Sequence, residues 1–262
     1  MNNQPIGILD SGVGGLTIWK EIVSLLPYES MVYIADSANC PYGEKSATEI
    51  LQFSRKMVQF LLDKDCKLIV IACNTISVSS LKALRKEFPR VDFIGTVPVV
   101  KTAGERSKNR RIGILSTSHT AESRYQQELI GKYRQDCEVI NVGTDRLVPL
   151  VERSAEQTLN KTLTEVLQPF ISARIDTLAL GCSHFPLLKK EIQQVLGNQV
   201  TILDSSEAIA RQVERVLKAR NEFCGDSPLV YTFYTTGNIL RFSEILKTMG
   251  YNENVEEVAF SV

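Results

Sequence analysis

An internal repeat of four short apolar runs constrains the fold of this chain more than any other feature. The runs of the first half recur in the second half in the same order, 106 to 109 positions later. The four pairs are Ile6–Leu9 with Ile112–Leu115, Met31–Asp36 with Cys137–Val142, Lys67–Cys73 with Asp176–Cys182, and Phe93–Thr96 with Thr201–Asp204. The first pair is identical, and the nearly constant separation predicts two copies of one folding unit.

Helical patterns lie between these apolar runs. Ser46 and Glu49 form a capping box, and Ile50, Met57 and Leu61 then follow the spacing of one helix face. Comparable stripes occupy residues 81–88, 159–170, 188–196 and 209–217. Strands that alternate with helices form parallel sheets covered on both faces. We therefore predict an α/β protein of two pseudosymmetric, doubly wound parallel-sheet domains, with the active site in the cleft between them.

The last part of the chain has no counterpart after the first half. It is predicted to contain a strand at Leu229–Thr235, a helix at Ile239–Met249 and a strand-like run at Val255–Phe260. No linker rich in Pro, Gly or Ser separates this tail, so we expect it to pack on one of the repeated units. The predicted first domain comprises residues 1–97 and 206–262, and the second comprises residues 98–205.

Composition excludes several classes of protein. The chain has 262 residues, and its 30 basic residues balance its 30 acidic ones. A neutral chain has no general attraction for nucleic acid or an anionic membrane. Apolar runs such as Leu68–Cys73 are far shorter than the roughly 18 residues of a membrane span. The N-terminus has no basic signal region, and six cysteines are too sparse for a disulfide scaffold. We expect a cytoplasmic protein without a membrane or direct nucleic-acid partner.

Polar residues follow the predicted strands directly, where open parallel sheets bind ligands. In the first copy these segments are residues 10–15, 40–43 and 73–75, and in the second copy residues 116–120 and 182–184. The segment Asp10–Gly15 reads DSGVGG, which differs from the dinucleotide fingerprint, and the chain has no P-loop. We interpret its glycines as positions where the backbone approaches a small anion closely.

Two cysteines, Cys73 and Cys182, occupy equivalent positions in the two copies. Each ends an apolar run and precedes a polar pair, Asn-Thr or Ser-His. Both could be buried packing residues, but a cysteine at a helix N-terminus has its thiolate favoured by the helix dipole. A zinc site of Cys73, Cys182 and His184 is an alternative, although close Cys spacings are missing. Nucleophilic catalysis with His184 as the base is another.

Two symmetry-related thiols suit a reaction whose two directions are mirror images. In a two-base racemase, one group removes a proton from one face of a stereocentre and the other delivers a proton to the opposite face. A thiol, with an ordinary pKa near 8.5, can be held as thiol or thiolate by modest shifts. Surrounding donors must then stabilise the carbanion.

The motifs around these residues resemble the cofactor-independent glutamate racemases of bacterial cell-wall synthesis. The resemblance covers nearly the whole chain and is strongest in six segments: Asp10–Leu16, Pro41–Gly43, Ala72–Thr75, Leu147–Glu152, Gly181–Pro186 and Thr235–Gly237. It implies the same two-domain fold and interconversion of L- and D-glutamate, which supplies D-glutamate for peptidoglycan. Ser183 stands where the family usually has Thr, which keeps the hydroxyl and loses a methyl group.

The resemblance also implies residue roles. Cys73 and Cys182 are the acid/base pair, with Asp10 beside Cys73 and with Glu152 and His184 assisting Cys182. The residues that would hold the substrate are Asp10, Ser11, Pro41, Tyr42, Gly43, Asn74, Thr75, Thr117, Thr120, Ser183 and His184. No metal is implied, and no cofactor is expected, because no motif contains the lysine that pyridoxal phosphate needs.

Competing functions remain at this point. A relative acting on aspartate or a hydantoin would share the paired cysteines, although aspartate-specific relatives tend to carry Glu where this chain has His184. A role as a gyrase-binding protein, reported for some family members, would depend on protein surface, because the neutral chain does not support DNA contact. By resemblance, the partners are glutamate and a second copy in a homodimer.

Overall fold

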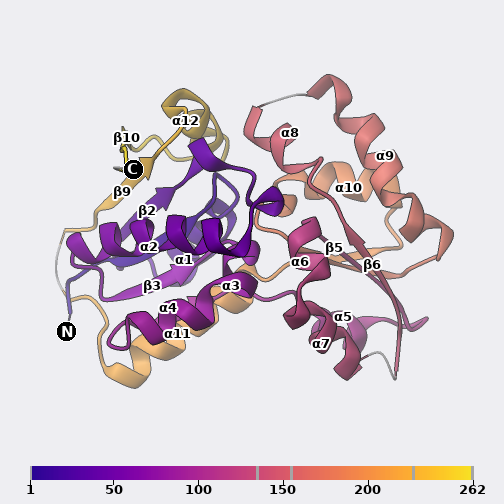
Figure 1. Ribbon diagram of the computed structural model, residues 1–262, viewed down its shortest axis with the longest axis horizontal. Coiled ribbons are helices and arrows are strands. Elements are labelled where there is room, and N and C mark those ends of the chain that lie inside the picture. Colours follow the sequence, from indigo (N-terminus) through magenta and orange to yellow (C-terminus); the bar gives the residue numbers. More distant parts are fainter. Residues whose placement is uncertain (1, 134–135, 154–155, 226–227, 261–262) are drawn as a thin grey trace.

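The computed structural model describes residues 2–133, 136–153, 156–225 and 228–260, which form two parallel β-sheets side by side (Figure 1). The first sheet has the strand order β10-β9-β2-β1-β3-β4, and the second has the order β6-β5-β7-β8. The strands are β1 (Ile6–Asp10), β2 (Met31–Ala35), β3 (Leu68–Ile71), β4 (Phe93–Gly95), β5 (Arg111–Ser116), β6 (Glu138–Gly143), β7 (Thr177–Gly181), β8 (Thr201–Leu203), β9 (Tyr231–Thr235) and β10 (Val255–Glu257).

The strand orders confirm the repeat. The order β2-β1-β3-β4 in the first sheet corresponds to β6-β5-β7-β8 in the second. The register agrees as well, because Ile6 pairs with Leu68 and Ile112 pairs with Thr177. These are the equivalences that the sequence separations predict. The central strands of both sheets are buried, and both sheets are covered by helices, so the predicted α/β class and doubly wound architecture are confirmed.

The alignment of β2 with β6 is wrong by two residues. Ile6 pairs with Met31, whereas the equivalent Ile112 pairs with Val139, so Met31 corresponds to Val139 and not to Cys137. The reason is that β6 lies at a sheet edge and its four central residues are only half-buried. A strand without a fully buried face leaves a weak hydrophobic pattern from which to read register.

The predicted helices are present with small changes at their ends. Ser46 caps α2 through the amide of Glu49, and the Glu49 carboxylate accepts the Ser46 amide in return. The helices are α1 (Leu16–Leu25), α2 (Ala47–Asp63), α3 (Asn74–Ser79), α4 (Leu81–Glu87), α5 (Val100–Arg106), α6 (Ser118–Glu122), α7 (Arg124–Tyr133), α8 (Val148–Arg153), α9 (Glu156–Ser172), α10 (Lys189–Leu196), α11 (Ser206–Arg220) and α12 (Ile239–Thr248), with 3₁₀ turns η1 (Ser37–Asn39), η2 (Tyr42–Glu44) and η3 (Phe185–Leu188).

The tail returns to the first sheet. Strand β9 pairs with β2, and β10 pairs with β9, so the first sheet has two more strands than the second. Helix α11 packs against α1 and β4, which also belong to the first unit (Figure 1). Trp19 of α1 packs edge-on against Phe233 of β9 and Tyr251 after α12. The domain boundaries at 97/98 and 205/206 stay a prediction.

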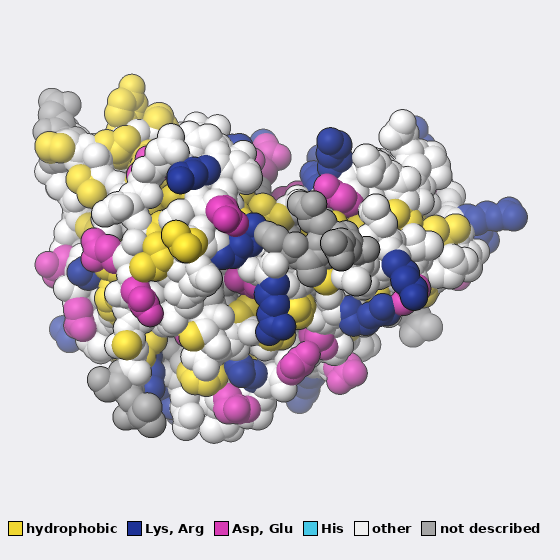
Figure 2. Space-filling view, turned by 90° about the horizontal axis from the view of Figure 1, so that it is seen from above, with side chains coloured by type: hydrophobic (Ala, Val, Ile, Leu, Met, Phe, Trp, Pro, Cys, Tyr) yellow, Lys and Arg dark blue, Asp and Glu magenta, His cyan; other side chains and the backbone are white. Residues whose placement is uncertain are grey.

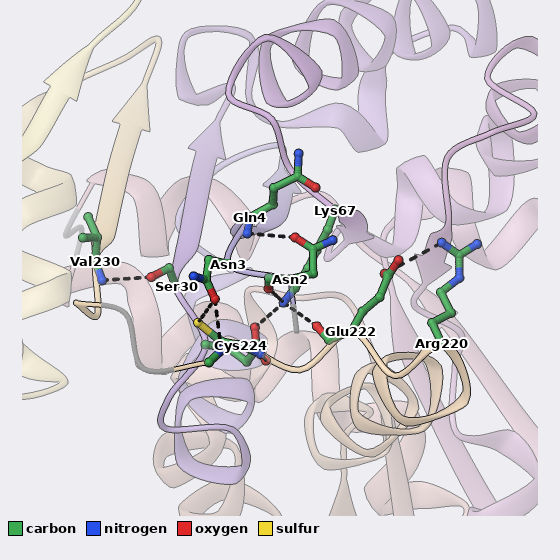
Figure 3. A network of polar contacts seen from close by, with 11 residues as sticks. Asn2, Asn3, Gln4, Ser30, Lys67, Arg220, Glu222, Cys224 and Val230 are labelled. Carbon is green, nitrogen blue, oxygen red and sulfur yellow. Dashed lines mark hydrogen bonds and ion pairs between the residues drawn. The ribbon is translucent and has the colours of Figure 1, made fainter.

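A buried ion pair ties the N-terminal segment to the tail (Figure 3). The Lys67 ammonium lies 2.6 Å from a carboxylate oxygen of Glu29, and the two side chains are 1% and 3% exposed. Lys67 also donates to the carbonyl oxygens of Asn2 and Glu222, and the second Glu29 oxygen accepts the amide of Cys224. This ion pair and its hydrogen bonds therefore connect four separate segments of the chain.

The surface carries charges of both signs. On the face shown in Figure 2, basic and acidic side chains are interspersed over both units. No helix among the described residues combines the length and the apolar character that crossing a membrane requires.

Candidate active site

The two cysteines predicted to be equivalent lie at the carboxyl ends of equivalent strands. Cys73 follows β3 and occupies the N-cap position of α3, whereas Cys182 follows β7 and leads into the turn η3. Their residues are 4% and 6% exposed. They lie near enough that a charge on Cys182 acts on the pKa of Cys73. The fold thus brings one thiol from each unit into a common buried region.

Asp10 lies at the end of β1, beside Cys73, and is fully buried. One of its oxygens accepts the amide of Gly12 at 2.8 Å, and the other accepts the hydroxyl of Ser183 at 2.9 Å. The Ser11 hydroxyl lies 3.5 Å from the Cys73 sulfur. Burial raises the pKa of Asp10 to about 6, although the positive charge of His184 and these hydrogen bonds oppose the shift. Near pH 7 the Asp10 carboxylate is therefore mostly ionised within the first unit.

His184 and Glu152 form an ion pair in the second unit. The Nε2 atom of His184 lies 2.6 Å from Oε1 of Glu152, which also accepts the amide of Val13 at 2.8 Å. Burial lowers the pKa of His184, but its contacts with Cys182, Cys40 and Glu152 outweigh burial and raise that pKa well above its ordinary value. Glu152, from α8, thus connects the two units through its hydrogen bond with the Val13 amide.

The helix dipole does not decide the state of Cys73, contrary to the sequence-based expectation. Burial, and to a lesser degree the charge of Asp10, raise the pKa of the Cys73 thiol to about 12, although the Ser11 hydroxyl and the Ile76 amide oppose the shift. Helix α3 has only six residues, so its dipole is small compared with the cost of burying a thiolate. Without a ligand, Cys73 is held as a thiol.

The glycines after β1 permit contact between the two units, and the interpretation that they also let the backbone approach an anion stays a prediction. A Cβ atom on Gly12 would clash with Oε1 of Glu152. A Cβ atom on Gly14 would lie 2.6 Å from the backbone nitrogen of His184. Neither position has room for a side chain while the loops after β1 and β7 remain packed together.

We expect Gly14→Ala to lower kcat/KM of the reaction at this site by about 100-fold. The substitution forces the loops after β1 and β7 apart, and a displacement of catalytic groups by about 1 Å has an effect of that size. The added methyl group meets the backbone of Ser183 and His184, so the loops themselves must separate. Steady-state kinetics checks this, with Gly131→Ala in α7 as the matched control because its Cβ meets nothing within 4 Å. Equal losses in both variants would contradict the contact argument.

The threonines predicted to hold substrate form one hydroxyl cluster across the two units. Oγ1 of Thr75 lies 3.0 Å from Oγ1 of Thr117, which donates to Thr120 at 3.0 Å. Asn74 lies next to Thr75 and is 3% exposed. Its side-chain NH₂ has no hydrogen-bond partner among the described residues. A buried donor without a partner is costly, which marks this place as one that a ligand completes.

The loop of Pro41, Tyr42 and Gly43 lies against the second unit. Pro41 caps the turn η2, and a Cβ atom on Gly43 would meet Asp145 and Thr117. The Tyr42 hydroxyl donates to Asp36 at 2.5 Å, and its ring packs on Phe53. The side chain of Tyr42 is thus engaged inside the first unit, so a ligand contact from this residue would come from its backbone.

Three residues with polar contacts at the site were not singled out from the sequence. The Tyr33 hydroxyl donates to the carbonyl oxygen of Gly12 at 2.9 Å, and Asp36 holds Tyr42. Arg241 of α12 donates to the carbonyl oxygen of Val151 at 2.6 Å, so the tail contacts the helix that carries Glu152. Asp36 could have been indicated because it is a polar residue directly after the apolar run of β2, but the uniformly apolar β2 does not single out Tyr33, and no pattern distinguishes Arg241 from other helix-surface residues.

The structure brings together a different set of possible metal ligands from the one inferred from the sequence. Among the described residues, the group whose potential ligand atoms lie within 4.8 Å of one another consists of Cys40, Glu152 and His184. The set inferred from the sequence, Cys73, Cys182 and His184, is not brought together in this way. Cys40 lies between β2 and the Pro41 turn, in the first unit, and burial raises the pKa of its thiol to about 11.

A family model described as Asp/Glu/Hydantoin racemase matches residues 6–213. The chain belongs to this racemase family. It is therefore an isomerase, an amino-acid racemase. Residues 6–213 include both cysteines, Asp10, Glu152, His184 and the threonine cluster, whereas β9, α12 and β10 lie outside the match.

The family's members include close relatives of this chain. A glutamate racemase of Oceanobacillus iheyensis is 38% identical over 253 residues, which cover 94% of this chain and 92% of that protein. The structure of glutamate racemase isoform RacE1 from Bacillus anthracis has 34% identity and a TM-score of 0.89, with all of both chains covered. Escherichia coli glutamate racemase, solved with L-glutamate and the activator UDP-MurNAc-Ala, has 31% identity and a TM-score of 0.87 over 99% of this chain and 100% of that chain.

Proposed function

We propose that this racemase interconverts L- and D-glutamate by proton transfer between two cysteines, without a cofactor. The observation that carries the proposal is the placement of Cys73 and Cys182 at equivalent strand ends of the two units, each with its own charged neighbour. Cys73 has Asp10 beside it, and the ring of His184, paired with Glu152, contacts Cys182. The glutamate racemases similar to this racemase support the choice of substrate.

The proposed reaction uses the two thiols in alternation. As a thiolate, Cys73 takes the α-proton from one face of D-glutamate, and the Cys182 thiol gives a proton to the opposite face. The product is L-glutamate, Cys73 is left as a thiol, and Cys182 is left as a thiolate. The reverse reaction exchanges the two roles. Proton transfer by positioned groups of this kind contributes about 10²- to 10⁴-fold each to the rate.

Substrate binding helps to form the thiolate in this proposal, and the thiol proton passes to the neighbouring Asp10 carboxylate. Glutamate brings an α-ammonium group into the site, and a nearby positive charge lowers the pKa of a thiol. Its carboxylates would be held by the unpartnered Asn74 amide, the hydroxyls of Thr75, Thr117 and Ser183, and backbone amides of the loops. These neutral donors would also stabilise charge that develops at Cα.

The proposal extends to biological role. A glutamate racemase supplies D-glutamate, and we propose that this racemase does so in the cytoplasm, for peptidoglycan, as a homodimer. The boundaries of the two domains at 97/98 and 205/206 belong to the same proposal. Size-exclusion chromatography with light scattering tests the dimer directly.

The activity itself is tested by circular dichroism of the purified protein after exhaustive dialysis against a chelator, with no pyridoxal phosphate added. We expect L-glutamate and D-glutamate each to lose optical activity until the signal is zero, and L-aspartate to keep its signal. Activity that disappears on chelation and returns with zinc would contradict two-cysteine chemistry. Turnover of L-aspartate at the rate of glutamate would contradict the substrate assignment.

Asp10→Asn is expected to lower kcat by about 100-fold with little change in KM, because Asp10 acts on Cys73 rather than on substrate. A rise in KM alone would instead assign Asp10 to substrate binding.

In the unmodified protein, kcat/KM should fall as the pH drops below about 6, where Asp10 takes up a proton beside the charged pair of His184 and Glu152.

The same substitution is expected to stabilise the protein at neutral pH. The folded state raises the pKa of Asp10 from 3.8 to about 6, so it binds this proton more tightly than the unfolded chain does. Above pH 6 the buried carboxylate therefore lowers the free energy of unfolding by up to about 3 kcal/mol, and this loss disappears as the pH falls through 6 towards 3.8. Urea unfolding at pH 7.5 and pH 4.5 checks whether the gain in Asp10→Asn shrinks at the lower pH.

A further inference from the structure

Three groups of different chemistry converge beside the catalytic region. Cys40 comes from the loop after β2, Glu152 from α8 and His184 from the loop after β7. One sulfur, one carboxylate oxygen and one imidazole nitrogen lie within 4.8 Å of one another, and the oxygen and nitrogen are 2.6 Å apart. The three donors come from both units, so only the assembled fold brings them together.

A route from solvent reaches these atoms. Cys40 and Glu152 line a cavity of about 210 Å³, whose other walls include Val13, Ser37 and Arg241. His184 lies behind Glu152, with its side chain 2% exposed. The side chains of Arg153 and Arg241 also line this cavity, and the imidazole lies next to the carboxylate.

We propose that Cys40, Glu152 and His184 form an inhibitory binding site for a thiophilic divalent cation, with zinc as the fitting ion. Sulfur, imidazole nitrogen and carboxylate oxygen are the ligand types that zinc binds at about 2.0 to 2.3 Å in tetrahedral geometry. A fourth position, facing the cavity, is left for water or another small ligand. The three ligand atoms lie within 4.8 Å of one another, so they need to shift only slightly to surround one ion. The Nε2 atom of His184 and the Oε1 atom of Glu152, now 2.6 Å apart, would have to separate. Both are small movements for a site that lies between two units.

The ligand set matches the charge of a divalent cation. Zinc binding would form one sulfur–metal, one oxygen–metal and one nitrogen–metal bond, and any proton that the thiol or the imidazole carries on its ligand atom would pass to solvent. The thiolate and the carboxylate then bring two negative charges to the two positive charges of the ion.

Zinc held in this way would prevent His184 from assisting Cys182. This consequence rests on the proposed function, whereas binding of the cation does not. The two are separated by measuring binding spectroscopically and inhibition by kinetics on the same protein.

The binding test titrates the full-length protein with cadmium, whose bonds to thiolates absorb in the ultraviolet. Cys40→Ser is expected to weaken cadmium binding by at least about tenfold and to remove this absorption, and Glu152→Gln to weaken binding to a similar degree. Cys73→Ser and the buried Cys66→Ser, which lies outside the cluster, are expected to keep both the absorption and the affinity. Circular dichroism in the far ultraviolet shows that each variant is folded.

Two results would overturn the site. Cadmium binding by Cys40→Ser at the affinity of the unmodified protein would exclude Cys40 as a ligand. Loss of binding in Cys73→Ser would transfer the site to the catalytic thiols. For inhibition, zinc should lower glutamate turnover in the unmodified protein at concentrations at least about tenfold below those needed for Cys40→Ser. Equal zinc inhibition of both proteins would refute the inhibitory role, even where cadmium binding stands.

Discussion

Replacing either Cys73 or Cys182 by serine should abolish racemisation while leaving one half of the proton exchange intact. A serine hydroxyl is far too weakly acidic to replace a thiol, so the rate of racemisation is expected to fall by about 10²- to 10⁴-fold. In the proposed mechanism, each variant keeps one competent thiol on one side of the substrate. That thiol should exchange the α-proton only of the enantiomer that presents its proton to that side.

The measurement is deuterium incorporation from D₂O into each enantiomer, followed by mass spectrometry. The variant that keeps Cys73 is expected to label D-glutamate, and the variant that keeps Cys182 to label L-glutamate. Cys66→Ser, at a buried thiol away from the site, is the control and should racemise and label both. Labelling of the same enantiomer by both active-site variants would contradict the two-sided arrangement, whatever their remaining activity.

Lys67→Met is expected to have the largest effect on stability. It removes one partner of a pair that is 1% and 3% exposed and leaves Glu29 as an uncompensated buried charge. Such a change lowers the free energy of unfolding by about 3 to 5 kcal/mol. Equilibrium unfolding in urea measures it. The double variant Lys67→Met/Glu29→Gln should recover part of the loss, because no unpaired charge remains and the introduced amide oxygen can still accept the Cys224 amide.

An ion pair on the surface provides the comparison. Arg55 lies 2.7 Å from Glu87, but these side chains are 43% and 39% exposed. Arg55→Ala should therefore change the free energy of unfolding by no more than about 1 kcal/mol. A similar loss in Lys67→Met and Arg55→Ala would show that burial does not set the strength of the Lys67 pair.

The repeat made much of the fold predictable from sequence. Identical letters at Ile6–Leu9 and Ile112–Leu115 placed the central strands, and the shared separation of the third pair placed β3 and β7 beside them. The register of β6 was not predictable, because its half-buried residues carry little hydrophobic pattern. The return of the tail followed from its lack of a linker, but which strand it would join did not.

The sequence indicated residues that the structure brings together, but it did not indicate most of the contacts between them; their roles at a site stay a prediction. Polar residues after buried strands marked Asp10, Cys73 and Cys182, because carboxyl ends of parallel strands share one edge. The pKa of Cys73 was not predictable, since it depends on burial that only the assembled units produce. Nor was the contact of Arg241 with Val151, because it joins segments 90 positions apart without any repeated pattern.

The hydrogen bonds between the two units have a consequence for the timing of turnover. Glu152 accepts the Val13 amide, Ser183 donates to Asp10, and the Thr75 hydroxyl lies within hydrogen-bond distance of the Thr117 hydroxyl. In the proposed reaction, glutamate would reach the two nearly inaccessible thiols only after these bonds break and the units move apart. Opening is then a step of every catalytic cycle, and its rate sets an upper limit on kcat that faster proton transfer cannot exceed.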